Sequence, residues 1–277
     1  MTSFALDAAT IRAEWTRSQV DDAAAQELWA VFSRQQQSPE QVGEDDFSLA
    51  IVLANSMVNP DSTVFDLGCG SGLYTSWFAR HCSHVVAADL SPEMLALAND
   101  RLTEEGVRSK VDLTQVNWHT CTSQQAPWHR AFDLSFANMT PAIQSAETFD
   151  AFRKTSRNWC YMSKPTRRNE PTTKELLKRL GKKDTHRPFE TDMLLAFCLL
   201  YAEGLNPHVD YRKVHWKKRQ SISEAAEYYS AWLATNYGID SEQRLRVKPI
   251  IEELAQDGFL DDQDDVTITS IWWQERQ

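Results

Sequence analysis

The pattern of apolar and polar positions alternates along the chain between a helical period and short β-rich runs. Apolar residues at helical spacing predict helices at 5–36 (two helices, with a break near 18–22), 45–57, 73–80, 91–103, 146–157, 192–204, 223–237 and 241–255. Short runs rich in β-formers predict strands at 64–66, 83–89, 111–116, 132–137, 159–162, 209–216 and 266–273. Strands that alternate with helices in this way are typical of an α/β domain with a mainly parallel sheet.

The stretch that follows the fifth predicted strand is less regular. Residues 164–183 carry two prolines and are predicted as a loop followed by a short amphipathic helix. Thr191 is predicted to cap the strongly apolar helix 192–204, and Gly204 is predicted to end it.

The order of the elements also suggests how the chain is divided. We expect residues 1–45 to form an N-terminal helical extension or lid, and residues 46–277 to form the main domain. Within that domain, residues of about 221–260 are expected to be a helical insertion before the last strand.

Composition and charge limit the classes of function. The chain is 42% hydrophobic and 25% charged, which is ordinary for a globular protein. No run approaches the ~20 apolar residues of a membrane span, and no apolar leader follows a basic start, so we expect a cytoplasmic protein without a membrane partner. Five scattered cysteines argue against a disulfide framework. A net charge of −10 argues against binding to DNA and disfavours RNA.

The most informative stretch is the one between the first predicted strand and its helix. Val64 and Phe65 lead to Asp66, and glycines at 68, 70 and 72 then open the helix. Glycine allows positive φ and lets a ligand lie against the backbone, and the following helix presents free N–H groups. A nicotinamide dinucleotide fingerprint needs a further glycine where this chain has Leu73, so that cofactor is disfavoured.

A second acidic residue ends the next predicted strand. Asp89 lies 17 residues after Gly72, a spacing that fits one helix and one strand. Neighbouring parallel strands end at the same edge of the sheet, so the carboxylate is expected beside the glycine turn, where it can accept both ribose hydroxyls. Ser91 as N-cap and Pro92 at the first helical position then start the next helix.

The acid followed by Gly-x-Gly-x-Gly, here Asp66 to Gly72, resembles motif I of the class I S-adenosylmethionine (SAM)-dependent methyltransferases. This resemblance implies a Rossmann-like fold, with a seven-stranded, mostly parallel sheet, helices on both faces and an antiparallel last strand. It also implies SAM as the cofactor. We predict no metal site, because His81 and His84 have no third ligand nearby in the sequence.

The resemblance further implies a set of cofactor contacts. Asp66 is expected to pair with the amino group of the methionine part, and Asp89 with the ribose. The other expected contacts are Gly68, Gly70, Gly72, Leu90, Met94, Asn117, Trp118 and Asn138. Leu90, Met94, Asn117 and Trp118 would lie near the adenine, although ordinary packing is an equal alternative for Trp118.

The residues expected near the transferred methyl group follow strand 132–137. Asn138 and Thr140 occupy the place of motif IV and are the catalytic candidates; the alternative is a helix-capping turn before Ile143. The segment shares only its first residue with the Asn-Pro-Pro-Tyr motif of amino-group methyltransferases, which counts against nucleic-acid N-methylation. No general base need be visible, because a sulfonium donor is already activated and alignment supplies much of the rate.

Two further features have open interpretations. Trp15 and Trp29 belong either to a lid over the substrate or to the packing of the N-terminal helices. The segment 153–219 is rich in Lys and Arg and is either a clamp for an anionic substrate or a solvated face.

The function predicted from these observations is transfer of a methyl group from SAM to a small-molecule acceptor by in-line displacement. The alternatives are an RNA or protein methyltransferase, a non-catalytic SAM-binding protein, and an aminopropyl transferase that uses decarboxylated SAM. The motifs point to SAM as the methyl donor. They point to no particular acceptor, acceptor atom or oligomeric state.

Overall fold

The computed structural model describes residues 7–16, 22–35, 41–121, 128–184 and 188–276. A single seven-stranded sheet in the order β3-β2-β1-β4-β5-β7-β6 forms its centre. The strands are β1 (Thr63–Leu67), β2 (His84–Asp89), β3 (Val111–Gln115), β4 (Phe132–Asn138), β5 (Ser156–Asn169), β6 (His208–Ser221) and β7 (Phe259–Gln274).

The directions of the strands agree with the fold predicted from the sequence. Strands β3, β2, β1, β4 and β5 are parallel to one another. Strand β7 lies between β5 and β6 and is antiparallel to both. The predicted seven-stranded, mostly parallel sheet with an antiparallel last strand is therefore confirmed.

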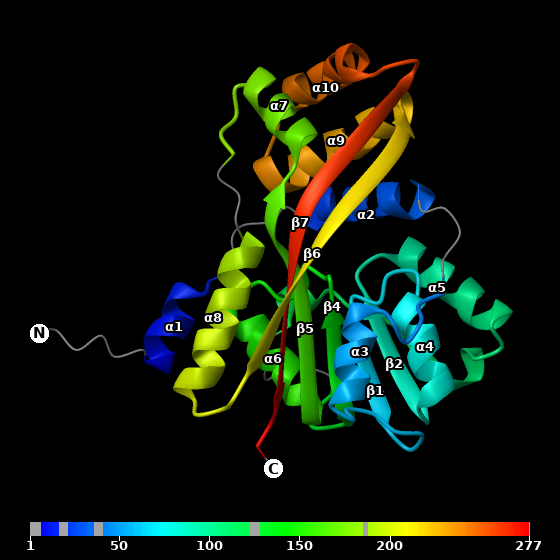
Figure 1. The fold of residues 1–277 in the computed structure, drawn as a ribbon, viewed down its shortest axis with the longest axis vertical. Coiled ribbons are helices and arrows are strands. Elements are labelled where there is room, and N and C mark those ends of the chain that lie inside the picture. The colour runs from blue at the N-terminus through cyan, green and yellow to red at the C-terminus, as the bar shows by residue number, and fades with distance from the viewer. Residues whose placement is uncertain (1–6, 17–21, 36–40, 122–127, 185–187, 277) are drawn as a thin grey trace, which may run out of the picture.

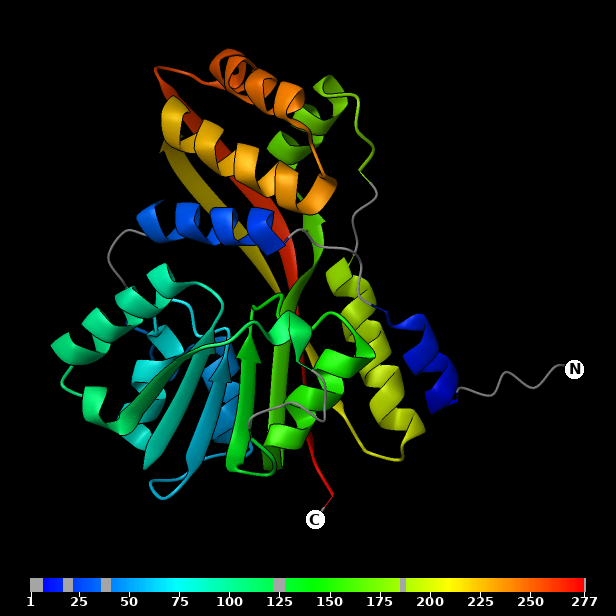
Figure 2. The ribbon, with the colours of Figure 1, turned by 180° about the vertical axis from the view of Figure 1, so that it is seen from behind.

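Helices cover both faces of the sheet, as Figures 1 and 2 show. They are α1 (Ala8–Glu14), α2 (Asp22–Gln35), α3 (Phe47–Ala54), α4 (Leu73–His81), α5 (Pro92–Glu104), α6 (Ala146–Thr155), α7 (Pro171–Arg179), α8 (Pro188–Ala202), α9 (Ile222–Tyr237) and α10 (Ser241–Leu254), with short 3₁₀ turns η1 (Arg108–Lys110) and η2 (Trp118–Thr120). Successive strand residues point to opposite faces. Phe65 thus joins the core under α1, α6 and α8, while Val64 joins the core under α3, α4 and α5.

A second lobe stands on the extended ends of β6 and β7. Figure 1 shows both strands continuing past the other strands, with α7, α9 and α10 gathered around them. A separate apolar core that includes Leu176, Leu233, Ile251 and Leu260 holds these three helices to β7. Helix α2 lies between the two lobes, where Leu28 and Val31 pack against Ala231 of α9. The sheet and the lobe therefore face one another across α2.

The structure corrects the loop predicted at the start of residues 164–183. Residues 164–169 continue β5 and pair with β7, from Lys164 opposite Thr269 to Asn169 opposite Asp265. The strand tolerates Pro165 because the register shifts just after it, and a proline in a sheet is expected at such an irregularity. Strand β5 also begins at Ser156, within the predicted helix 146–157; the short helix predicted farther on is α7.

Three other boundaries differ from the prediction. Helix α8 begins at Pro188, so Thr191 lies inside it and is not its N-cap. Strands β6 and β7 are much longer than the predicted 209–216 and 266–273, because they pair with each other from His208 opposite Trp272 to Ser221 opposite Phe259. The predicted break near 18–22 falls mostly on residues outside those described.

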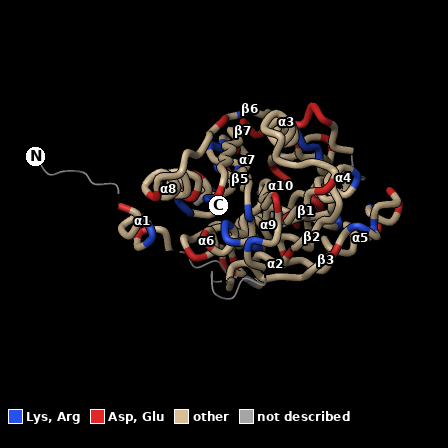
Figure 3. The backbone as a smooth tube through the Cα atoms, turned by 90° about the horizontal axis from the view of Figure 1, so that it is seen from below, with Lys and Arg blue, Asp and Glu red and all other residues tan. Residues whose placement is uncertain are grey.

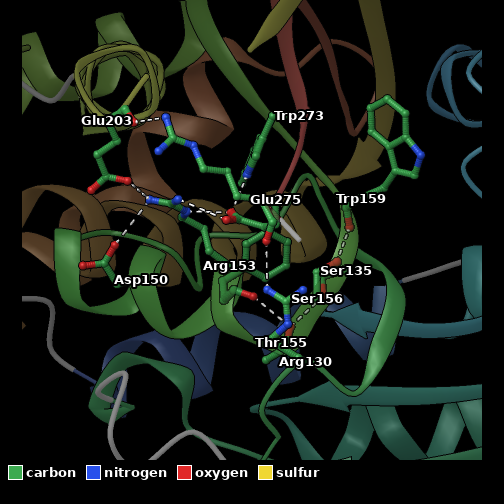
Figure 4. Close-up of polar contacts among 12 residues, drawn as sticks. Arg130, Ser135, Asp150, Arg153, Thr155, Ser156, Trp159, Glu203, Trp273 and Glu275 are labelled. Atoms are coloured by element: carbon green, nitrogen blue, oxygen red, sulfur yellow. Dashed lines mark hydrogen bonds and ion pairs between the residues drawn. The ribbon is translucent and has the colours of Figure 1, made fainter. Parts of the chain in front are cut away.

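Charged side chains fasten the N- and C-terminal segments to the sheet. Arg153 of α6 pairs with Glu203, after α8, at 2.6 Å and with Glu275, after β7, at 2.7 Å (Figure 4). Arg12 of α1 pairs with Glu203 and with Asp150 of α6. Seen from below, Lys and Arg lie interspersed with Asp and Glu over the backbone (Figure 3). The start of the basic segment is therefore used to hold the fold.

Candidate active site

A cavity of about 530 Å³ lies at the carboxyl ends of β1, β2 and β4, beside the glycine turn. Nine of the ten residues predicted to contact the cofactor line it: Asp66, Gly68, Gly70, Asp89, Leu90, Met94, Asn117, Trp118 and Asn138. Thr140 also lines it, and so do residues that the sequence did not single out, among them Phe32, Tyr74 and Lys218. The chain thus brings nearly all of the predicted residues to one hollow.

The three glycines of the turn meet three different requirements. All have positive φ: +71° at Gly68, +54° at Gly70 and +78° at Gly72. A Cβ at Gly68 would lie 2.1 Å from Thr140 Oγ1, and one at Gly72 would lie 3.0 Å from the Cβ of Ala98. A Cβ at Gly70 would meet no atom within 4 Å. Gly70 therefore presents bare backbone to open space, whereas Gly72, outside the cavity lining, lets α4 and α5 pack closely.

Asp89 lies beside the glycine turn, at the end of β2. Its Oδ2 accepts a hydrogen bond from the Gly70 N–H at 2.9 Å, and its Oδ1 accepts one from the Ser91 N–H at 2.9 Å. Burial raises the pKa of this carboxyl, against the effect of these backbone donors. The carboxylate therefore fixes the turn and also lines the cavity, where its contact with a ribose stays a prediction.

Asp66 places a buried carboxyl group in the wall of the cavity. The residue is 3% exposed, and its Oδ2 accepts a 2.6 Å hydrogen bond from Thr75 Oγ1. Burial raises the pKa of this carboxyl to about 7, and the nearby charge of Asp89 acts in the same direction. No Lys, Arg or His among the described residues forms an ion pair with it. A cationic group of a ligand would suit this position.

The predicted adenine contacts receive different structural roles. Trp118 is 2% exposed, packs against Phe65 with ring centroids 5.5 Å apart, and donates its indole N–H to the Thr148 carbonyl at 3.0 Å. Its main role is therefore packing, although it also lines the cavity. Asn117 caps η2 by accepting the His119 N–H at 3.1 Å.

The turn after β4 contains the two catalytic candidates. The Asn138 side-chain oxygen accepts hydrogen bonds from the hydroxyls of Ser48 and Ser163. Thr140 Oγ1 accepts the Ala142 N–H at 3.2 Å, a contact within the turn. The alternative of a helix-capping turn before Ile143 is wrong, because the next helix, α6, begins at Ala146 and is capped by Ser145.

Met139, between the two candidates, has φ +57°. Positive φ is uncommon for a residue with a side chain, and such strain gathers at functional sites. The Met139 N–H donates to the Ser163 carbonyl at 3.0 Å, which helps to hold the strained turn. The amino-acid pattern carries no signal for this conformation.

A second cavity of about 600 Å³ adjoins the first, between α2 and the lobe. Its walls are rich in aromatic side chains: Trp29 and Phe32 of α2, Phe189 of α8, Trp216 of β6, and Tyr228 and Trp232 of α9. The residues common to both cavities are Trp29, Phe32, His119, Met139, Pro141 and Lys218. The strained turn after β4 therefore lies where the cavities meet.

The two tryptophans of the N-terminal helices differ in role. Trp15 is 3% exposed, packs against Phe149 and donates its indole N–H to Asp192 at 2.8 Å, so it is a packing anchor. Trp29 lines both cavities and belongs to their wall.

The basic residues of segment 153–219 also have two different roles. Arg153, Arg157 and Arg219 form ion pairs within the fold, with Glu275, Asp133 and Asp261 respectively. Arg168, which pairs with Glu170, and Lys218 line the second cavity.

Within the described ranges, no group of three or more His, Cys, Asp and Glu side chains is arranged to hold a metal ion. None of the described helices combines the length and the apolar character that a membrane span requires.

Comparison with known proteins finds a family match for the part of the chain from β1 to the start of β5. Residues 64–159 match the family model described as a methyltransferase domain. A 48-residue stretch is 50% identical to a magnesium-protoporphyrin O-methyltransferase of Rhodobacter capsulatus, covering 17% of this chain and 21% of that protein. A 106-residue stretch is 30% identical to a release factor glutamine methyltransferase of Cereibacter sphaeroides, covering 38% of this chain and 35% of that protein. The alignments thus span about a fifth to a third of these relatives.

Similarity of fold extends farther along the chain than similarity of sequence. A solved structure from Bacillus halodurans, described as a possible methyltransferase, superposes with a TM-score of 0.51 at 14% identity. The match covers 85% of this chain and all of that one. The predicted resemblance to the class I methyltransferases and the Rossmann-like fold are thereby confirmed.

Proposed function

We propose that this chain, whose residues 64–159 carry a methyltransferase domain, transfers a methyl group from SAM to a small molecule. The observation that carries the proposal is the meeting of two cavities at the turn after β4. One is framed by the glycine turn and two buried carboxylates, and the other by aromatic side chains. Such a pair suits a donor and an acceptor that react at their junction.

The residues of the first cavity fit the parts of SAM. Gly70 leaves open space where a side chain would stand, so a ligand can reach the backbone of the turn. Asp89 would bind the ribose hydroxyls, and Asp66 would bind the methionine ammonium, a cation that suits its uncompensated charge. Leu90 and Met94 would flank the adenine.

The chemistry that SAM supplies when bound is an activated methyl group on a positively charged sulfur. The chain's own residues would bind and align the two reactants and exclude water, and alignment of this kind is worth up to roughly 7–11 kcal/mol. Asn138 and Thr140 would hold the shape of the turn at the junction, since their oxygens accept hydrogen bonds from neighbouring groups. No side chain is assigned here as a general base.

The acceptor cavity favours a small molecule over a protein or RNA. Of the two relatives described above, one is named for magnesium-protoporphyrin and the other for a glutamine of a release factor. In this chain the second cavity lies between α2, β6 and α9, and its volume is within the range typical of sites for small ligands.

We also infer a cytoplasmic location, and a lid role for residues 1–45 through the part of α2 that lines both cavities.

A calorimetric titration with SAM and with S-adenosylhomocysteine tests the proposal. Both should bind, and Asp89→Ala should weaken binding by about tenfold or more, because hydrogen bonds to a charged group are lost. Asp100→Ala changes an exposed carboxylate on α5 and should bind as the wild type does. Circular dichroism should establish that Asp89→Ala is folded, since Asp89 also holds Gly70. The proposal would be refuted if neither SAM nor S-adenosylhomocysteine bound to the wild type.

A further inference from the structure

Lys218 occupies a distinctive place in the two-cavity arrangement. Its side chain extends from β6 and lines both cavities, and it is the one Lys or Arg among the six shared residues. Its ammonium lies 4.0 Å from the ring centroid of Tyr228 and 6.0 Å from that of Phe32. Whatever occupies the junction of the cavities must therefore meet this cation.

The ammonium has no ion-pair partner among the described residues. The neighbouring cation Arg168 differs, because it pairs with Glu170 at 2.7 Å. Desolvation lowers the pKa of Lys218, while the charges of Asp262, Glu224 and Asp264 favour its charged form. The residue is exposed, so the ammonium is within reach of a ligand, and an anionic group of that ligand would supply the missing ion-pair partner.

Other hydrogen-bond donors in the same wall also lack partners. The indole N–H of Trp232 and the Nε–H of Arg168 are buried without an acceptor among the described residues. The two side chains adjoin, with the Arg168 guanidinium carbon 5.0 Å from the Trp232 ring centroid. Buried polar groups are nearly always hydrogen-bonded, so unsatisfied donors in a cavity wall call for a ligand rich in oxygen acceptors.

The acidic residues of the wall are compatible with such a ligand. Asp262 is already occupied, since it accepts hydrogen bonds from Thr172 and Tyr229. Burial, together with the charges of Asp262 and Glu170, raises the pKa of Asp264 to about 7. Asp264 Oδ1 is also buried without a hydrogen-bond partner among the described residues. Near neutral pH a large share of Asp264 is protonated, and in that form the carboxyl can donate a hydrogen bond to a ligand oxygen.

We propose that the acceptor is a flat, ring-containing molecule that carries an acidic oxygen, a carboxylate or a phenol, which Lys218 holds where the two cavities meet. The aromatic rings of Trp29, Phe32 and Tyr228 supply flat surfaces, and Lys218 supplies the charge. This inference rests on the proposed function for the identity of the first cavity. It adds the chemical class of the acceptor and its anchoring residue.

The test compares three naphthalene probes that differ in charge: naphthoate, naphthol and naphthylmethylamine. Binding of each is measured by equilibrium dialysis with S-adenosylhomocysteine present. Naphthoate should bind about tenfold or more tightly than naphthylmethylamine. Lys218→Met should abolish this preference, and Lys218→Glu should reverse it in favour of the amine, an effect that loss of packing alone would not produce. Lys213→Met, an exposed lysine of the same strand that lines neither cavity, should leave the preference unchanged.

Each outcome decides the inference separately from the proposed function. A preference for the amine, absence of binding by naphthoate, or an unchanged preference in Lys218→Glu would overturn the inference. Titration of S-adenosylhomocysteine into the same wild-type sample decides the first cavity independently. If it binds while the charge preference is absent, the acceptor class is wrong and the methyltransferase proposal stands.

Discussion

At the scale of single residues, Asp66 links the cofactor cavity to pH. The raised pKa of about 7 means that the folded, ligand-free protein holds a proton there that the unfolded chain releases near pH 4. This contribution to stability is thus greatest at low pH and is lost as pH rises through 7. A ligand ammonium needs the ionised form, so binding requires release of that proton.

We therefore expect the affinity for S-adenosylhomocysteine to be nearly constant above pH 7 and to fall by up to about tenfold per pH unit below it. Calorimetry between pH 5.5 and 8, about the range over which this carboxyl titrates, measures the profile. Asp66→Asn should bind weakly throughout and show a flat profile. A wild-type affinity that stays constant over the whole range would contradict the assignment of Asp66 to the ammonium.

Gly72 gives a second prediction at this scale. Gly72→Ala adds a methyl group 3.0 Å from Ala98 to a backbone with positive φ, so it should cost about 1–2 kcal/mol for the backbone and a further 1–3 kcal/mol for overpacking. Gly106→Ala is the matched control, because its φ is also positive but open space surrounds it. Urea denaturation should show the larger loss for Gly72→Ala; equal losses would show that α4 and α5 adjust freely.

At the scale of elements, the sequence predicted what local pattern decides. The glycine turn, the strand that ends at Asp89 and the helix capped by Ser91 are encoded within a few residues of each position, and the structure contains all three. The full length of β6 and β7 is not encoded locally. Their ends pair with each other, and these partners lie far apart in the sequence.

The same reason explains what was missed in the site. Lys218 and Phe32 meet at the cavity junction only after α2 has packed against α9, a contact between distant parts of the chain. The composition of segment 153–219 showed that it is basic. It did not show which of its Lys and Arg side chains line a cavity. The residues of the first cavity could therefore be predicted from the sequence, whereas most residues of the second cavity could not.

A buried ion pair joins β5 to α8 and gives a prediction for elements. Lys164 is fully buried and donates to Asp192 at 2.7 Å, while Trp15 donates to the other carboxylate oxygen. Asp192→Ala would leave the ammonium uncompensated and should cost about 3–5 kcal/mol in the free energy of unfolding. Asp261→Ala breaks an exposed pair with Arg219 and should cost about 0–1 kcal/mol. Comparable losses in urea denaturation would contradict a structural role for the buried pair.

At the scale of the whole molecule, the site belongs to neither lobe alone. The sheet supplies the glycine turn and both carboxylates, the lobe supplies Tyr228 and Trp232, and α2 closes the space between them with Trp29. The fold resembles that of a solved structure described as a possible methyltransferase, whereas the family match at residues 64–159 ends before β6, α9 and β7. We therefore expect the donor to bind mainly to the part of the chain that the family match covers, and the acceptor mainly to the part that the match leaves out.

A crystal structure with S-adenosylhomocysteine tests this account most directly. We predict the ligand in the first cavity, with its ribose hydroxyls on Asp89, its amino group near Asp66 and its sulfur directed toward Met139 at the mouth of the second cavity. A ligand bound elsewhere on the chain, or one whose sulfur points away from the second cavity, would contradict the central claim that the two cavities hold donor and acceptor.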